Sequence, residues 1–121
     1  MNLANKPPLG LCAPAAKSPA IRKSARGQSC TLRVPGVCTG DPNTTVACHV
    51  QAPGMGIMSG KQSDLHVIHG CSACHAVLDC RDRWADAAIG WDDVLRALIE
   101  TQNRLMQAGL IRLGKAKGGA Q

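Results

Sequence analysis

Four cysteines in two pairs constrain the fold of this chain more than any other feature. Cys71 and Cys74 form a C-x-x-C motif, and Cys30 and Cys38 form a wider pair earlier in the chain. Two such pairs in a chain of 121 residues are typical of a four-thiolate zinc site. The first pair is spaced more widely than the usual interval of about two to four residues, so the second pair carries the stronger signal. We expect one structural Zn²⁺ bound by all four thiolates.

The composition shows why a metal would help this chain to fold. It contains two tryptophans, no phenylalanine and no tyrosine, and its length allows a single domain. A core of small aliphatic side chains would be thin, and a structural metal is a common remedy in small domains. Zinc binding adds on the order of 10 kcal/mol to the folding of small zinc peptides. The odd number of cysteines, seven, and the lack of a continuous apolar export signal argue against a disulfide framework.

The basic residues gather toward the two ends of the chain, and the formal net charge is +6. Six basic residues and no acidic one precede Asp41, and four basic residues follow the last acid, Glu100. This distribution predicts a polyanionic partner, most simply DNA bound by its phosphates. Arg22, Lys23 and Arg26 are the first candidates for these contacts. The alternative is a solvated basic segment on a stable protein.

The hydrophobic pattern predicts an α+β domain over residues 21–113. Residues 1–20 are expected to be a disordered leader rich in proline and alanine, and residues 114–121 a flexible tail. No stretch of about 18 apolar residues is present, so we expect no membrane span. The expected elements are strands at 31–34, 44–50 and 65–69, a helix at 72–87, and a second helix that begins at Asp92 as N-cap and stops at Gly109.

Two of these elements carry the side chains with chemical potential. Along the strand 44–50 the side chains alternate, so Cys48 should face the core with its apolar neighbours and His49 should face away. On the helix that follows Cys71, His75 and Asp79 lie one turn apart on the same face. Between these elements lies a glycine-rich segment at 53–60.

The order of strand with His49, glycine-rich segment, return strand and helix resembles the ββα-metal arrangement of HNH, or His-Me finger, nucleases. With its cysteine pairs it would be the zinc-stapled form, similar to a treble clef. More closely, residues 22–83 resemble the YbcO-like nuclease family of phages and prophages. The segments that carry the resemblance are residues 22–27 (RKSARG), 34–38 (VPGVC), the His49 strand, and 71–75 (CSACH) with Asp79.

This resemblance implies a metal-dependent DNA endonuclease that hydrolyses phosphodiester bonds. It implies that His49 is the general base that activates water, and that His75 and Asp79 bind Mg²⁺ or another divalent cation. Asp64 matches the middle HNH position and would orient His49 or bind the metal. The protein would act on duplex or branched DNA in the cytoplasm of a bacterial host, encoded by a phage or prophage.

One position departs from the pattern and keeps a second function open. HNH nucleases commonly place an aspartate directly before the base histidine, whereas this chain has Cys48 there. A thiolate is a poor partner for magnesium, and we interpret Cys48 as a core residue. The alternative function is a non-catalytic zinc module that binds DNA or a phage protein. In that case His49 would be structural, and His75 would be a zinc ligand or a helix cap.

Overall fold

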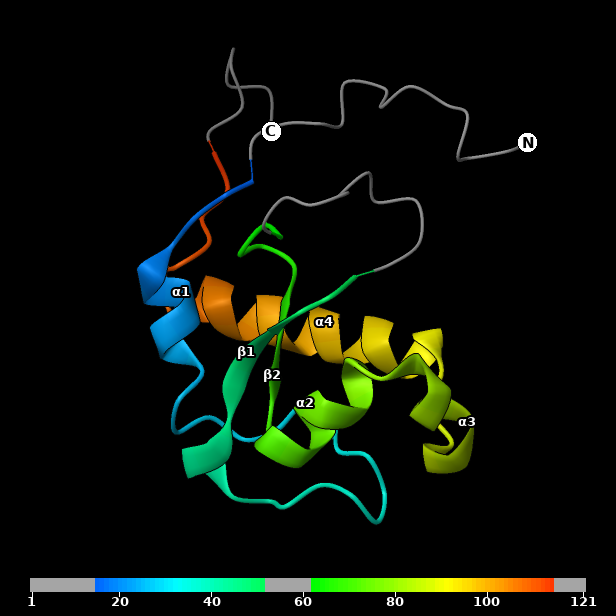
Figure 1. Ribbon diagram of the computed structural model, residues 1–121. Coiled ribbons are helices and arrows are strands. Elements are labelled where there is room, and N and C mark those ends of the chain that lie inside the picture. The colour runs from blue at the N-terminus through cyan, green and yellow to red at the C-terminus, as the bar shows by residue number, and fades with distance from the viewer. Residues whose placement is uncertain (1–14, 52–61, 115–121) are drawn as a thin grey trace, which may run out of the picture.

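The computed structural model describes residues 15–51 and 62–114, and Figure 1 shows their arrangement. They form an antiparallel hairpin in which Val46 pairs with Gly70 and His49 pairs with Val67. Helices lie around this hairpin, which confirms the predicted α+β class. The elements in chain order are α1 (Pro19–Ser24), a short 3-10 helix η2 (Pro42–Thr44), β1 (Val46–His49), β2 (Val67–Gly70), α2 (Ser72–Leu78), a second 3-10 helix η3 (Arg81–Arg83), α3 (Trp84–Ala87) and α4 (Trp91–Gln107).

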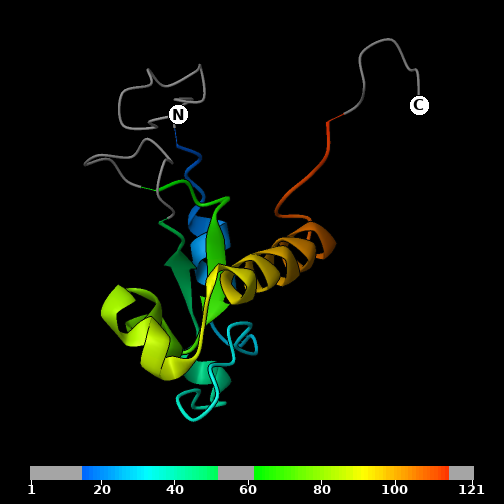
Figure 2. The ribbon, with the colours of Figure 1, turned by 90° about the vertical axis from the view of Figure 1, so that its right-hand side faces the viewer.

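The hairpin is covered on both faces, and Figure 2 shows α4 on one side of it and the α2–α3 segment on the other. The main core packs Cys48 and Ile68 of the hairpin against Trp84 and the first half of α4. A smaller cluster on the other face joins Val67 to α1 and to the second half of α4 through Leu105. The predicted alternation therefore holds at Cys48, which is fully buried.

The helix expected at 72–87 is broken into two, and this prediction was wrong. α2 ends at Leu78, and the chain continues through η3 into the short helix α3. The indole N–H of Trp84 donates to the backbone oxygens of Val77 and Leu78, at 3.0 and 3.3 Å. These carbonyls lie at the end of α2, where the helix supplies no further N–H donors; the indole joins the Cys80 N–H as a donor to Val77 and also donates to Leu78.

The start of α4 also differs from the prediction, whereas its end agrees. Gly90, not Asp92, is the N-cap residue. The backbone N–H of Gly90 donates a hydrogen bond of 2.9 Å to the Asp93 carboxylate. Gly109 follows the helix with a φ of 75°, the left-handed conformation typical of a helix stop. Among residues 15–51 and 62–114, no helix is long and apolar enough to span a bilayer.

Two predicted strands changed as well. Residues 31–34 form no strand, because Arg33 has a φ of 48° and this interrupts the extended backbone. The strand expected at 44–50 is limited to β1, because the side chain of Asp41 accepts a hydrogen bond from the Asn43 N–H and begins the 3-10 turn η2. The predicted glycine-rich segment at 53–60 lies outside the described residues.

Helix α1 lies across the expected boundary between leader and domain. The hydroxyl of Ser18 accepts from the N–H of Ile21 and caps α1, and the backbone oxygen of Ala16 accepts from the N–H of Asp64 at 2.8 Å. Residues just before 21 are thus tied to the hairpin. The division of the chain into leader, domain and tail stays a prediction, since residues 1–14 and 115–121 lie outside the described ranges.

Candidate functional site

The four predicted zinc cysteines come together in the structure. The sulfur atoms of Cys30, Cys38, Cys71 and Cys74 all lie within 4.8 Å of one another. Four ligands at about 2.3 Å from a tetrahedral zinc would be about 3.8 Å apart, and the sulfurs of Cys38 and Cys71 are 3.9 Å apart. The cluster is therefore able to hold one metal ion and is compatible with zinc.

Backbone N–H groups donate to three of these sulfurs, those of Cys30, Cys71 and Cys74. At Cys38 and Cys74 burial dominates and raises the pKa of the thiol. Burial raises the pKa of the Cys71 thiol, but hydrogen bonds from the backbone of Cys74 and Thr39 outweigh it and lower this pKa to about 6. A thiolate is the form that binds metal. The N–H···S contacts run from Arg33 to Cys30 at 3.4 Å, from Val34 to Cys74 at 3.4 Å and from Thr39 to Cys71 at 3.5 Å.

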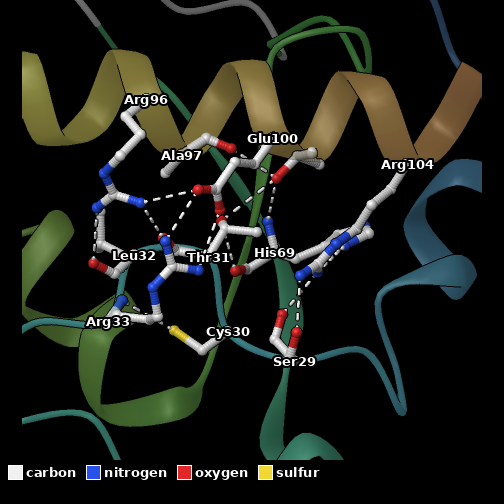
Figure 3. Close-up of polar contacts among 11 residues, drawn as sticks. Ser29, Cys30, Thr31, Leu32, Arg33, His69, Arg96, Ala97, Glu100 and Arg104 are labelled. Carbon is white, nitrogen blue, oxygen red and sulfur yellow. Dashed lines mark hydrogen bonds and ion pairs between the residues drawn. The ribbon is translucent and has the colours of Figure 1, made fainter.

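Helix α4 holds the loop that carries Cys30, as Figure 3 shows. The guanidinium of Arg104 donates to the backbone oxygen and the hydroxyl of Ser29, both at 2.7 Å. Arg96 donates to the backbone oxygen of Thr31 at 2.9 Å, and Arg33 forms two hydrogen bonds with Glu100 at 3.0 and 2.9 Å. This bracing explains how a widely spaced cysteine pair can be held in place without a strand.

His49 is held by a buried carboxylate. Its Nε2 atom lies 2.8 Å from Oδ1 of Asp64, whose side chain is 3% exposed, whereas the His49 side chain is 30% exposed. The other oxygen of Asp64 accepts from the Ser18 N–H at 2.7 Å and from the Arg22 guanidinium at 3.0 Å. Burial raises the pKa of Asp64, but these hydrogen bonds and charges outweigh it and keep this pKa below its usual value. Asp64 is thus an ionised group with both oxygens occupied.

His75 and Asp79 meet as the helix spacing predicted. The Nε2 atom of His75 lies 3.0 Å from Oδ2 of Asp79, and both side chains are exposed to solvent. Asp79 also lines a cleft of about 380 Å³, and His49 lies on the wall of the same cleft. The cleft is further lined by Val50, Gln51, Leu78, Arg81, Trp84 and Trp91. His49 and Asp79 therefore line one cleft, whereas His75 is not among its lining residues and Asp64 is joined to the cleft only through its contact with His49.

Comparison with known proteins places this arrangement in a family. The family model described as "Putative nuclease YbcO" matches residues 19–110, a range that includes the cysteine cluster and the cleft. This chain belongs to the YbcO family. Relatives named "Putative nuclease YbcO" in Escherichia coli (strain K12) and "Putative nuclease ybcO" in Enterobacteria phage 82 are each 37% identical over 92 residues, which are 76% of this chain and 96% of the relative.

A solved structure shares the fold of this chain. It is described as "Structure of a putative bacteriophage protein from Escherichia coli str. K-12 substr. MG1655". It is 37% identical to this chain, with a TM-score of 0.59, and the match covers 74% of this chain and 100% of that one. The family model and both relatives carry the name "putative nuclease".

Cys48 of this YbcO family member lies in the core, as interpreted from the strand pattern. Its thiol is within 3.8 Å of the backbone oxygen of Gly70, and a Cβ at Gly70 would meet its sulfur at 2.9 Å. Burial raises the pKa of the Cys48 thiol to about 12 and outweighs the lowering effect of the Gly70 backbone. Cys48 therefore remains a neutral thiol that faces away from the cleft.

Three features of the site gave no clear signal in the sequence. The contacts of Ser18 and Arg22 with Asp64 join segments far apart in the chain, and Arg81 lies beside the cleft only because the expected helix breaks. His69 carries no motif, yet it is buried, and burial together with the charge of Arg104 lowers its pKa to about 4. Its neutral ring lies in the polar contacts that join β2 to α4.

Proposed function

We propose that this protein is a metal-dependent DNA endonuclease in which His49 is the general base. One observation carries the proposal: a histidine fixed by a buried carboxylate lies on the wall of the cleft that also contains Asp79. The element order of β1, β2 and α2 agrees with the ββα-metal arrangement. The names of the relatives favour a nuclease over other enzymes that use histidine as a base.

The contact with Asp64 assigns the two ring nitrogens of His49 different roles. An ionised carboxylate only accepts hydrogen bonds, so Nε2 of His49 carries the proton in the 2.8 Å contact. In the neutral ring Nδ1 then has a free lone pair, which can take a proton from a water molecule that attacks the phosphate. Because both oxygens of Asp64 are occupied, it orients His49 and is not a metal ligand.

His75 and Asp79 fit a divalent cation as two of its ligands. In their 3.0 Å contact Nε2 of His75 carries the proton that Asp79 accepts, so a bound cation would replace this proton and take both atoms as ligands. A bound cation would stabilise negative charge on the phosphate and on the leaving oxygen. One nitrogen and one oxygen donor suit manganese or nickel as well as magnesium. The remaining positions would be left to water and to phosphate oxygens.

The DNA would be bound by its phosphates from α1. Arg22, Lys23 and Arg26 are exposed along this helix and the turn that follows it. Arg22 also contacts Asp64, so it links the binding surface to the support of His49. The lack of phenylalanine and tyrosine argues against recognition of single strands by stacking, and it favours duplex or branched DNA.

Replacement of His49 by alanine tests this function. The wild type should cleave plasmid DNA with at least one of magnesium, manganese and nickel, and His49→Ala should cleave about 10²–10⁴-fold more slowly. His49 is outside the cysteine cluster, so zinc content should match wild type, whereas the lost contact with buried Asp64 should lower the melting temperature without unfolding the protein. These two measurements serve as the control for folding.

The second candidate is a zinc module that binds DNA or a phage protein without cleaving it. It is favoured by the residue directly before His49, which is a buried cysteine, Cys48, and supplies no carboxylate ligand. If the wild type cleaves neither plasmid nor branched DNA with any of the three metals but still binds zinc, this second candidate replaces the endonuclease. Unchanged cleavage by His49→Ala would instead remove only the role of His49.

A further inference from the structure

Arg81 lies between the two tryptophans of the chain. Its guanidinium carbon is 4.7 Å from the ring centre of Trp84 and 4.3 Å from that of Trp91. The two rings meet edge to face, with centres 4.9 Å apart and planes at 66°. Each cation–π contact contributes about 0.5–1 kcal/mol at an exposed site. Together the indoles restrict a long side chain that would otherwise be free in solvent.

The charge of Arg81 has no acidic partner among the described residues. The ion pairs found there involve Arg22, Arg33 and Arg96 as well as the two histidine pairs, but not Arg81. Tryptophan rings orient a guanidinium but do not neutralise it. An ordered arginine without a carboxylate is therefore available to an anion that comes from outside the protein.

This available charge lies where the proposed reaction would occur. Arg81 lines the same cleft as His49 and Asp79, and Trp84 and Trp91 form part of its wall. A guanidinium presents N–H groups in a plane that matches two oxygens of one phosphate, and stacking on a ring leaves these edges free. The cleft thus combines a candidate base, a candidate cation ligand and a fixed positive group.

We propose that Arg81 binds a backbone phosphate of the DNA strand that enters this cleft, and that Trp84 and Trp91 orient its guanidinium for this contact. The inference rests on the proposed function in that the ligand is DNA, but phosphate binding at Arg81 does not require cleavage. It gives the cleft a phosphate contact that is separate from the basic residues of α1.

The tryptophans supply a direct measurement of this site. Because the chain has only Trp84 and Trp91 and no tyrosine, its intrinsic fluorescence reports on the Arg81 cluster alone. The full-length, zinc-loaded protein is titrated with a short duplex, without added divalent cation, and indole fluorescence and fluorescence anisotropy of labelled DNA are followed. DNA bound at Arg81 should change the indole fluorescence of the wild type in step with the anisotropy.

Arg81→Gln and Arg83→Gln form a matched pair, because both remove one exposed arginine from η3 and only Arg81 lines the cleft. Arg81→Gln should lose the fluorescence change and bind the duplex about 10- to 100-fold more weakly, as expected for a lost hydrogen-bonded charge. Arg83→Gln should keep the fluorescence change and an affinity close to wild type. Arg81→Lys keeps the charge without the planar group and should bind with an affinity between those of the wild type and Arg81→Gln.

Failure of this inference can be separated from failure of the proposed function. If Arg81→Gln melts like the wild type and still binds and responds like Arg83→Gln, Arg81 does not bind phosphate, whatever the protein cleaves. If Arg81→Gln unfolds, Arg81→Lys is used in its place. Wild-type affinity and fluorescence response in Arg81→Lys would show that the planar guanidinium is not needed, which would overturn the proposed contact. If the wild type cleaves nothing but loses its fluorescence response in Arg81→Gln, the phosphate site stands and only the endonuclease falls.

Discussion

A single buried carboxylate, Asp64, connects three parts of the molecule. It accepts a hydrogen bond from the N–H of Ser18 before α1, contacts Arg22 on α1, and lies 2.8 Å from His49 at the end of β1. A buried carboxylate is costly unless it is paired and hydrogen-bonded, and here each oxygen has a partner. The same contacts that make its burial tolerable also fix the ring of His49.

The low pKa of Asp64 gives a prediction at this scale. A carboxyl group with a pKa below its unfolded value stabilises the fold above about pH 4, and this contribution is lost as the pH falls through the folded pKa. The free energy of unfolding of Asp64→Asn should therefore be about 1.5–3 kcal/mol lower than that of the wild type at about pH 7. This difference should shrink below about pH 4. Urea unfolding of both proteins with excess zinc measures it. Equal stability at neutral pH would contradict a role for Asp64 in tying α1 to the hairpin.

At the scale of elements, local patterns predicted well where local interactions decide. The alternation along β1 placed Cys48 in the core, although Val46 on the same face is 40% exposed, and the helical spacing brought His75 and Asp79 together. The break after Leu78 was missed because the indole of Trp84 competes for the last carbonyls of α2. Residues 31–34 were misread because Arg96 of α4, far along the chain, donates hydrogen bonds to the carbonyls of Thr31 and Leu32 and holds this loop in a non-extended form.

The loop and α2 are joined through the cysteine cluster, which gives a prediction for these elements. Cys71→Ser should lose zinc and most of the cooperative unfolding, because metal binding is part of the folding free energy in small zinc domains. Cys80→Ser is the matched control, since Cys80 lies near the same helix but outside the cluster. Elemental analysis and thermal melting measure both effects. Full zinc content in a normally melting Cys71→Ser protein would rule out a four-cysteine site.

At the scale of the whole molecule, two segments far apart in the chain bring positive groups to the surroundings of His49. Arg22 reaches its support, Asp64, from α1, and Arg81 lines the cleft from η3. Net charge could be counted from the sequence, but this arrangement depends on contacts between α1, the hairpin and the turn after α2. It also shows that Arg22 is a poor choice for a pure binding test, because its removal would disturb Asp64 and hence His49.

Lys23 and Arg26 therefore make the cleaner test of electrostatic binding. Each neutralised phosphate contributes about 0.9 to the slope of log affinity against log salt, so Lys23→Ala with Arg26→Ala should lower the slope by about 1.8. Arg112→Ala, which removes one exposed charge beyond α4, is the control for net charge and should leave the slope nearly unchanged. Fluorescence anisotropy with a labelled duplex at several salt concentrations gives these slopes. If Arg112→Ala lowers the slope by about as much per removed charge as the double variant does, binding follows the net charge of the protein, and α1 is not a specific DNA-binding element.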